Sequence, residues 1–255
     1  MLLCILQSIV TRNDYFIFKD IIMRNNVLLL CKLLLISTIF ISFQANGQKI
    51  SPTKHLPLIE YRSTGNNDYY VIFLTGNGGL RNLAQSVIDY FNSKNVSVLV
   101  INTKKYLWKE KGPEQIACDL EKLVDQYNNK WGETKVVFLG YSMGAEVLPF
   151  AVNCMEDKYI NELKDMILIG PWQKATFKVR LRDYLFEVNE GEDIYSEFLK
   201  LKTKRAYVIC DDNKYSICHK DLERVLDHDF LEGGHHFGGA YLTLSRLIGK
   251  RLNIE

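Results

Sequence analysis

The chain carries little net charge and lacks the patterns that mark several common binding modules. It has 32 Lys and Arg residues against 30 Asp and Glu residues, which leaves a formal net charge of +2. So small a charge gives no basic field for nucleic acid, although it is compatible with peripheral contact with an anionic membrane. No C-x-x-C pair is present, so we expect no zinc site. Residues 48–255 also have no internal repeat or low-complexity tract, and no motif in this region requires a cofactor.

The N-terminal part of the chain predicts a removable leader. Residues 1–22 mix a short apolar run with charged side chains, which suits neither a signal peptide nor a spanning helix. From Met23 the pattern changes to a basic residue, a long apolar run and a small-residue ending, which is typical of a secretory signal peptide over 23–47. We therefore expect 1–22 to be an erroneous extension and 48–255 to be one exported domain, periplasmic or secreted. An uncleaved N-terminal anchor is the alternative.

Cleavage of this leader removes two of the six cysteines and leaves Cys118, Cys154, Cys210 and Cys218. An even number of cysteines in an oxidising compartment permits disulfides. Cys210 and Cys218 are close in the chain and flank a polar loop, so they form the best candidate pair. Cys118 and Cys154 fall on predicted helices, where they either pair or serve as small buried apolar side chains.

Short β-rich runs alternate with helical patterns throughout the mature region. This alternation predicts one α/β domain, with a mostly parallel sheet covered by helices on both faces. The predicted strands are 55–62, 70–74, 96–101, 135–139, 166–169, 206–210 and 229–231. The predicted helices are 83–91, 113–130, a helix directly after residue 144, and 240–252. Residues 176–190 precede the fifth core strand, and the alternation over 177–181 predicts a small cap or an extra hairpin there.

The segment 140–144 reads Gly-Tyr-Ser-Met-Gly and matches the nucleophile motif G-x-S-x-G. In that motif a strained strand-to-helix turn holds the serine hydroxyl clear of the backbone, and the glycines let the chain pass close to its neighbours. The context agrees, because a buried strand pattern precedes the motif and a helical pattern follows it. We therefore predict that Ser142 is a nucleophile. A plain strand–turn–helix junction of another α/β fold is the alternative.

Acyl transfer at a serine requires two fixed N–H donors for the oxyanion. The residue after the nucleophile, Met143, is the first candidate. The glycine-rich loop 75–79 directly follows a predicted strand, so the second donor is Asn77 or Gly78. The same loop could hold a phosphate, but Arg81 stands where the G-x-G-x-x-G fingerprint needs its third glycine.

The expected chain order in a hydrolase of this type is serine, acid, histidine. Asp211 and Asp212 both follow the predicted strand 206–210. We prefer Asp212, because the acid usually sits a residue or more beyond the strand end, with Asp211 second. His235 and His236 lie in a glycine-rich turn after the last strand, and we predict His235 as the general base, with His236 contacting substrate. A metal-binding histidine pair is the alternative, although adjacent positions suit two ligands poorly.

Two segments are specific enough to indicate a family. Residues 140–150 read Gly-Tyr-Ser-Met-Gly-Ala-Glu-Val-Leu-Pro-Phe, and residues 233–237 read Gly-Gly-His-His-Phe. In these and other segments between 69 and 252 the chain resembles the AcvB/VirJ family of exported α/β-hydrolases. The resemblance implies an α/β-hydrolase fold and a periplasmic serine hydrolase that removes the amino acid from aminoacylated phosphatidylglycerol, chiefly the lysyl form. It also implies a triad of Ser142, His235 and an aspartate at 211 or 212, and links to virulence and type IV secretion.

A lysyl ester is cationic, so the implied substrate calls for a carboxylate near the serine. Glu146 and Glu232 are the candidates, and a solvated surface position is the alternative for both. Tyr106 and Trp108 are candidates for contacting the lipid, with aromatic core packing as the alternative.

Departures from the family pattern bear on the substrate and on the acid. The family usually has aspartate where this chain has Asn77, and its nucleophile motif more often continues Ser-Phe-Gly-Ala-Asp than Ser-Met-Gly-Ala-Glu. The loop 210–218 is also shorter than is usual. Two other functions therefore remain open. One is a serine esterase or peptidase acting on another envelope substrate, and the other is a non-catalytic member of the fold that binds an envelope or secretion-system protein.

Overall fold

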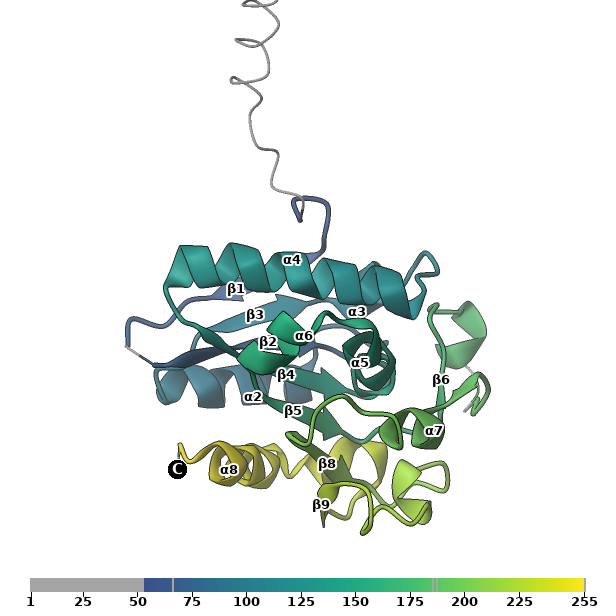
Figure 1. Ribbon diagram of the computed structural model, residues 1–255. Coiled ribbons are helices and arrows are strands. Elements are labelled where there is room, and N and C mark those ends of the chain that lie inside the picture. The colour runs from purple at the N-terminus through teal and green to yellow at the C-terminus, as the bar shows by residue number, and fades with distance from the viewer. Residues whose placement is uncertain (1–52, 66, 185, 187, 255) are drawn as a thin grey trace, which may run out of the picture. The chain divides into compact units, whose positions relative to one another are not determined.

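Hydrophobic runs of the chain assemble into a seven-stranded sheet (Figure 1). The structure is a computed structural model, and it describes residues 53–65, 67–184, 186 and 188–254. The strands are β1 (Leu58–Tyr61), β2 (Tyr69–Leu74), β3 (Val98–Ile101), β4 (Lys135–Tyr141), β5 (Leu163–Ile169), β8 (Ala206–Cys210) and β9 (Asp227–Phe230). Their order is β1-β3-β2-β4-β5-β8-β9, and all pairs are parallel except the edge pair β1 and β3. Each strand expected from the sequence is present.

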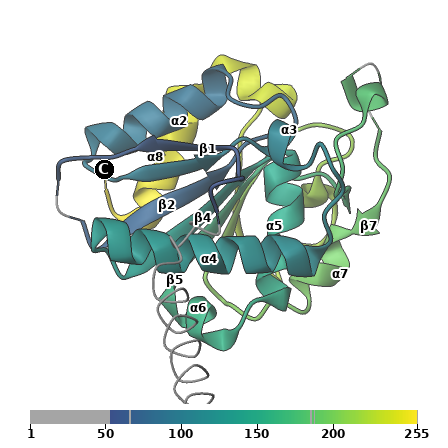
Figure 2. The ribbon, with the colours of Figure 1, turned by 90° about the horizontal axis from the view of Figure 1, so that it is seen from above.

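Helices cover both faces of this sheet, as the sequence predicts. The longer helices are α2 (Asn82–Ser93), α4 (Pro113–Trp131), α5 (Met143–Cys154) and α8 (Tyr241–Leu252), and the shorter ones are α3 (Thr103–Tyr106), α6 (Asp157–Glu162) and α7 (Ile194–Phe198). α2 and α8 pack on one face, and α4 and α5 on the other (Figure 2). The central strands β2, β4, β5 and β8 are apolar along most of their length because both of their faces are buried.

The parallel direction of the strands determines where chemistry can occur. The carboxyl ends of parallel strands lie at one edge of a sheet, and ligands bind in the crevice outside that edge. Here the segments that leave β2, β4, β5 and β8 begin with Thr75, Ser142, Gly170 and Asp211. Side chains far apart in the sequence therefore meet at this edge.

The segment before β8 is predicted to form a small cap or an extra hairpin, and residues 177–181 are not a strand within it. A short antiparallel pair forms instead between β6 (Lys174–Ala175) and β7 (Glu192–Asp193), with the 3-10 helix η1 (Leu181–Tyr184) between them. The alternation arises because Phe177 and Val179 turn inward. The Phe177 ring packs edge-on against Phe150 of α5 at a centroid distance of 5.2 Å, and the Val179 N–H donates to the Leu107 carbonyl at 2.8 Å. This segment is a cap packed on the helix layer.

The predicted leader over 23–47, and the extension before it, lie outside the described residues. In the part of the chain that is described, no helix is both long enough and apolar enough to cross a bilayer. Cys210 and Cys218 form a disulfide, as predicted, whereas Cys118 and Cys154 are free thiols.

A close backbone contact between α5 and β2 yields a stability prediction. A Cβ on Gly144 would lie 2.2 Å from the Leu74 carbonyl oxygen at the end of β2. Replacing Gly144→Ala should therefore force α5 away from the sheet and cost about 3 kcal/mol, lowering the melting temperature by roughly 6–12 °C in a thermal unfolding scan. Gly112→Ala is the control, because a Cβ there meets only the Glu114 carboxylate. Equal melting temperatures for the two variants would contradict this packing.

Candidate active site

Ser142 occupies the sharp turn between β4 and α5. Its backbone has φ 52° and ψ −124°, a region that residues with a Cβ rarely adopt and that persists only where the surroundings enforce it. The Ser142 N–H donates to the Ile169 carbonyl at 2.9 Å, which fastens the turn to the end of β5. A Cβ on Gly140 would lie 2.6 Å from the Ala145 backbone. The glycines of the motif are thus required by close backbone contacts, and they hold the serine hydroxyl at the sheet edge.

His235 brings its imidazole to that hydroxyl from the turn after β9. The Nε2 atom of His235 lies 2.8 Å from the Oγ of Ser142, and its Nδ1 atom lies 2.8 Å from the Oδ2 of Asp211. A carboxylate accepts hydrogen bonds, so the Nδ1 atom carries a proton and donates a hydrogen bond to Asp211. Nε2 is then free to accept from the serine hydroxyl. Ser142, His235 and Asp211 form a continuous hydrogen-bonded line.

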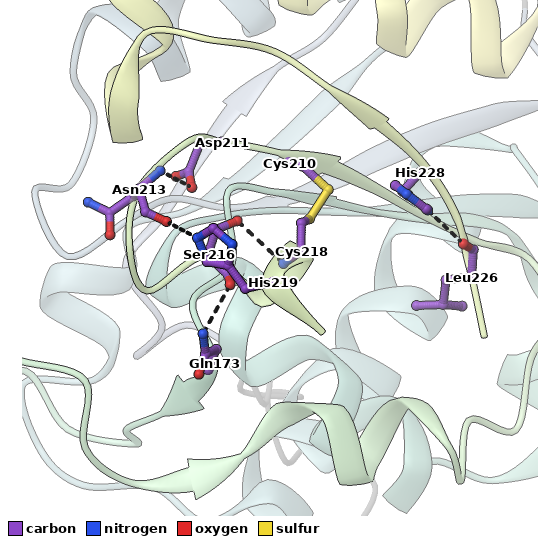
Figure 3. The surroundings of a disulfide bond; sticks show 9 residues. All are labelled: Gln173, Cys210, Asp211, Asn213, Ser216, Cys218, His219, Leu226 and His228. Atoms are coloured by element: carbon purple, nitrogen blue, oxygen red, sulfur yellow. Dashed lines mark hydrogen bonds between the residues drawn. A yellow bond between two sulfur atoms is a disulfide. The ribbon is translucent and has the colours of Figure 1, made fainter. Parts of the chain in front are cut away.

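Asp211 is held rigidly at the end of β8. Its carboxylate is fully buried, and its Oδ1 atom accepts from the Asn213 N–H at 3.3 Å. The disulfide between the flanking Cys210 and Cys218 closes the loop, and the Ser216 N–H donates to the Asn213 carbonyl at 2.9 Å inside it (Figure 3). The loop therefore presents one carboxylate oxygen to the histidine in a fixed direction.

This geometry corrects the preference for Asp212 as the acid. The Asp212 carboxylate points instead to the backbone of the histidine turn, where it accepts from the N–H groups of Gly234 and, at 3.4 Å, Gly233. The hydrogen bond from Gly234 lowers the pKa of Asp212 below its usual value. The two neighbouring carboxylates thus have different partners. One holds the imidazole, and the other holds the turn that carries it.

Tyr141, the variable residue before the nucleophile, supports the same histidine turn. Its hydroxyl donates to the His235 carbonyl at 3.0 Å and lies 2.8 Å from the Nδ1 atom of His236. Its ring also stacks on the His235 imidazole at a centroid distance of 5.5 Å. Burial, followed by electrostatic interaction with the neighbouring His235 and Arg81, lowers the pKa of His236, so its ring is neutral near pH 7. His236 is thus a partner of Tyr141 in holding the turn.

The candidate oxyanion donors lie beside the serine. Met143 is the first residue of α5, and the first N–H groups of a helix have no intrahelical acceptor. The glycine-rich loop is a tight turn in which the Gly79 N–H donates to the Gly76 carbonyl at 2.9 Å. A Cβ on Gly76 would lie 3.2 Å from the Cβ of Ser142, so this loop packs directly against the nucleophile. Two hollows open beside Ser142, one on each side. Asn77 borders both of them and Gly78 borders one, which favours Asn77 as the second oxyanion donor.

A hollow of about 600 Å³ opens in front of Ser142 and His235, and the cap residues Thr176, Phe186 and Val188 border it. We call it the cap-side hollow. Glu146 contributes the one carboxylate among the described residues along its border, with its side chain 7% exposed.

Glu146 follows Ser142 by four residues, and its N–H donates to the Ser142 carbonyl at 2.9 Å, so both lie on one face of α5. Glu232, the other predicted carboxylate, is exposed and borders neither hollow beside the serine.

Tyr106 and Trp108 lie away from these hollows, which corrects their predicted contact with substrate. The Tyr106 hydroxyl donates to the buried Asp119 carboxylate of α4 at 2.8 Å, and its side chain is buried in the core. Lys111 also donates to Asp119, at 3.1 Å, so the three residues fasten the start of α4. Trp108 is half exposed and borders neither hollow.

The structure also brings in residues that sequence reasoning missed. The Trp172 ring lies 5.3 Å from the His235 ring and borders the cap-side hollow. Gly170 leaves room for the acid, because a Cβ there would lie 3.1 Å from the Oδ2 of Asp211. Both residues follow β5 at the edge of the sheet where the parallel strands end. Their position directly after a predicted strand is the feature of the sequence that could have indicated them. The metal-pair alternative finds no support, because both ring nitrogens of His235 are engaged by Ser142 and Asp211.

Comparison with known proteins now places the chain in a family. Residues 68–254 match the family model described as bacterial virulence protein VirJ. The chain belongs to the VirJ family. This confirms the predicted resemblance over residues 68–254. No curated protein sequence is significantly similar to the chain.

Solved structures similar to this VirJ-family chain share its fold at low sequence identity. MenH of S. aureus has a TM-score of 0.57 and 12% identity, over 77% of this chain and 97% of MenH. An esterase of Pyrococcus furiosus has a TM-score of 0.55 and 14% identity, over 78% and 90% of the two chains. An α/β-hydrolase enzyme from a Moroccan lagoon metagenome has a TM-score of 0.50 and 17% identity, over 76% and 92%. The predicted α/β-hydrolase fold is confirmed.

The division of work between the two aspartates yields a kinetic prediction. Asp211→Asn should lower kcat for an aryl ester on the order of 10³- to 10⁴-fold, because the amide cannot favour the Nδ1-protonated histidine. Asp212→Asn keeps an oxygen that accepts from Gly234, so its kcat should fall less than about tenfold. Steady-state kinetics of both variants, each checked for folding by circular dichroism, provides the measurement. A larger loss in Asp212→Asn than in Asp211→Asn would reverse the assignment.

Proposed function

We propose that the protein is a serine hydrolase that cleaves the aminoacyl ester of aminoacylated phosphatidylglycerol, chiefly the lysyl form. The observation that carries the catalytic part is the line of hydrogen bonds from Asp211 through His235 to Ser142, with both bonds to the imidazole at 2.8 Å. A side-chain set of this kind activates a hydroxyl for acyl transfer. The substrate class comes from membership of the VirJ family and from the charge of the cleft.

The acylation step follows from the geometry. His235 accepts the Ser142 proton at Nε2 as the serine oxygen attacks the ester carbonyl. The oxyanion that forms is stabilised by the N–H of Met143 and by that of Asn77. The tetrahedral intermediate then loses the glycerol oxygen of the lipid, which takes the proton from Nε2. The amino acid remains on Ser142 as an acyl ester.

Deacylation repeats the same proton transfers with water. A water molecule gives its proton to the Nε2 atom of His235 as it attacks the acyl ester. When the second intermediate collapses, Nε2 returns the proton to the Ser142 oxygen, and the free amino acid leaves. Asp211 stays ionised throughout and stabilises the imidazolium in both steps. These acylation and deacylation steps need no cofactor.

The cap-side hollow supports a cationic acyl group. Glu146 is almost fully buried, and a carboxylate that is shielded from water favours a positively charged ligand, because the attraction between charges is stronger at low exposure. Glu146 lies one helical turn from Ser142 on the border of the cap-side hollow, and we assign the acyl part of the ester, with its ammonium group, to this hollow. A lysyl side chain provides such a group.

The cap and the disulfide support a lipid substrate outside the cytoplasm. Phe186 borders the cap-side hollow with its side chain 67% exposed, and Leu181 on the same cap is 72% exposed. Exposed apolar side chains beside a cleft suit contact with a membrane surface, which would supply the lipid. The Cys210–Cys218 disulfide fits an oxidising compartment, in agreement with the signal peptide predicted from the sequence.

Release of lysine from lysyl-phosphatidylglycerol vesicles tests the proposal. The mature protein should hydrolyse this lipid, and Ser142→Ala should reduce the rate to background. Hydrolysis of aryl esters without hydrolysis of the lipid would support an esterase acting on another envelope substrate. Absence of activity on both, in folded protein with its disulfide intact, would support a binding role.

The role of Glu146 yields a separate specificity prediction. Lysyl and norleucyl esters of one alcohol differ only in the terminal ammonium group. Glu146→Gln should lower the ratio of kcat/KM for the lysyl ester to that for the norleucyl ester about tenfold, because one charge-assisted contact is lost. Glu232→Gln, at an exposed glutamate outside the cleft, is the matched control. A ratio that stays the same in Glu146→Gln would exclude Glu146 as the partner of the ammonium group.

A further inference from the structure

A second hollow, of about 650 Å³, borders the catalytic pair on the side of the glycine-rich loop. We call it the loop-side hollow. Its border comprises residues 76–84, from the glycine-rich loop into α2, together with Tyr141 and Tyr241. Ser142 and His235 border this hollow and the cap-side hollow alike, so the reacting atoms lie where the two meet. An ester bound at Ser142 would extend its acyl part into one hollow and its alcohol part into the other.

The two hollows carry charges of opposite sign. Along the described border of the loop-side hollow there is one arginine, Arg81, and no carboxylate. The described border of the cap-side hollow has Glu146 and neither arginine nor lysine. The charge of the cleft therefore changes from negative to positive on passing the serine. This polarity fits an ester with a cation in its acyl part and an anion in its alcohol part.

Arg81 is positioned by the glycine-rich loop itself. Its Nε atom donates to the Gly78 carbonyl at 3.3 Å. A Cβ on Gly78 would lie 3.0 Å from that Nε and 3.2 Å from the Cδ of Arg81, so the absence of a side chain at Gly78 lets the arginine lie against the loop. The field of Arg81 reaches the catalytic turn, where its charge contributes to the lowered pKa of His236.

We propose that the loop-side hollow binds the phosphodiester in the alcohol part of the substrate, with Arg81 as the residue that recognises it. This rests on the proposed function and assigns the orientation of the ester, with the amine toward Glu146 and the phosphate toward Arg81. In an aminoacylated phosphoglycerol only the glycerol carbons separate the ester oxygen from the phosphate. An arginine guanidinium presents several N–H donors in a plane that matches phosphate oxygens, which suits it to this task. The glycerol that leaves Ser142 would thus be held by its phosphate while His235 protonates it.

Two soluble esters that differ only in the phosphodiester provide the test. One is the lysyl ester of glycerol, and the other is the lysyl ester of glycerophosphomethanol. Arg81→Gln should lower the ratio of kcat/KM for the phosphodiester-bearing ester to that for the phosphate-free ester about tenfold, through loss of a charge-assisted contact. Arg81→Lys should retain part of the ratio, because it keeps the charge without the planar fork. Arg224→Gln, at an exposed arginine outside both hollows, should keep the wild-type ratio.

A ratio unchanged in Arg81→Gln, or lowered equally in Arg224→Gln, would overturn the proposal. A second measurement is needed to distinguish failure of this proposal from failure of the proposed function. It is the binding of glycerophosphomethanol to the Ser142→Ala protein, measured by calorimetry. If wild-type protein hydrolyses neither lysyl ester, the proposed substrate is wrong. In that case the phosphodiester site would still be supported if glycerophosphomethanol binds the Ser142→Ala protein and binds about tenfold more weakly when Arg81→Gln is added. Absence of binding would refute the site. Comparison with inorganic phosphate distinguishes a phosphodiester site from a site for free phosphate, since the proposal requires the diester to bind more tightly.

Discussion

The backbone turn at Ser142 is the constraint on which the rest of the site depends. A residue with a Cβ is held at positive φ because β4 ends directly against the start of α5, and Gly144 lets that helix approach the end of β2 within contact of a carbonyl. This close approach brings the glycine-rich loop against the serine from one side. The same turn places Glu146 and the first N–H of α5 in the cleft. Loosening it would therefore disturb Ser142, the N–H of Met143 and Glu146 together.

The histidine turn depends on three anchors at the ends of two strands, β8 and β4. Asp211 after β8 holds the His235 imidazole, Asp212 holds the backbone of the turn, and Tyr141 at the end of β4 holds both the turn and its second histidine. The anchors act on one short glycine-rich segment, which has little conformational preference of its own. Rigid strands thus impose the geometry that the segment could not maintain alone. This explains why His235, the proposed general base, can come from a loop and still lie within hydrogen-bond distance of the serine.

Much of the architecture was predictable from the sequence because it follows from local patterns. Continuous apolar runs indicated buried parallel strands, and the order of serine, acid and histidine placed the three roles along the chain. The choice between Asp211 and Asp212 was not predictable, because it depends on the direction of each side chain as the chain leaves β8. Tyr106 was misassigned because its partner, Asp119, comes from a helix later in the chain. The alternation over 177–181 indicated a cap or hairpin before β8, and its period of two comes from inward packing on a helix layer without a strand at these residues.

The central claim is that Ser142 is an activated nucleophile, and covalent labelling with a fluorophosphonate tests it most directly. The measurement uses mature protein beginning near Gln48, with its Cys210–Cys218 disulfide intact, and maps the modified peptide by mass spectrometry. The account predicts modification at Ser142 that is lost in Ser142→Ala and greatly slowed in His235→Ala. Absence of labelling in folded wild-type protein, or labelling that persists in Ser142→Ala, would contradict it.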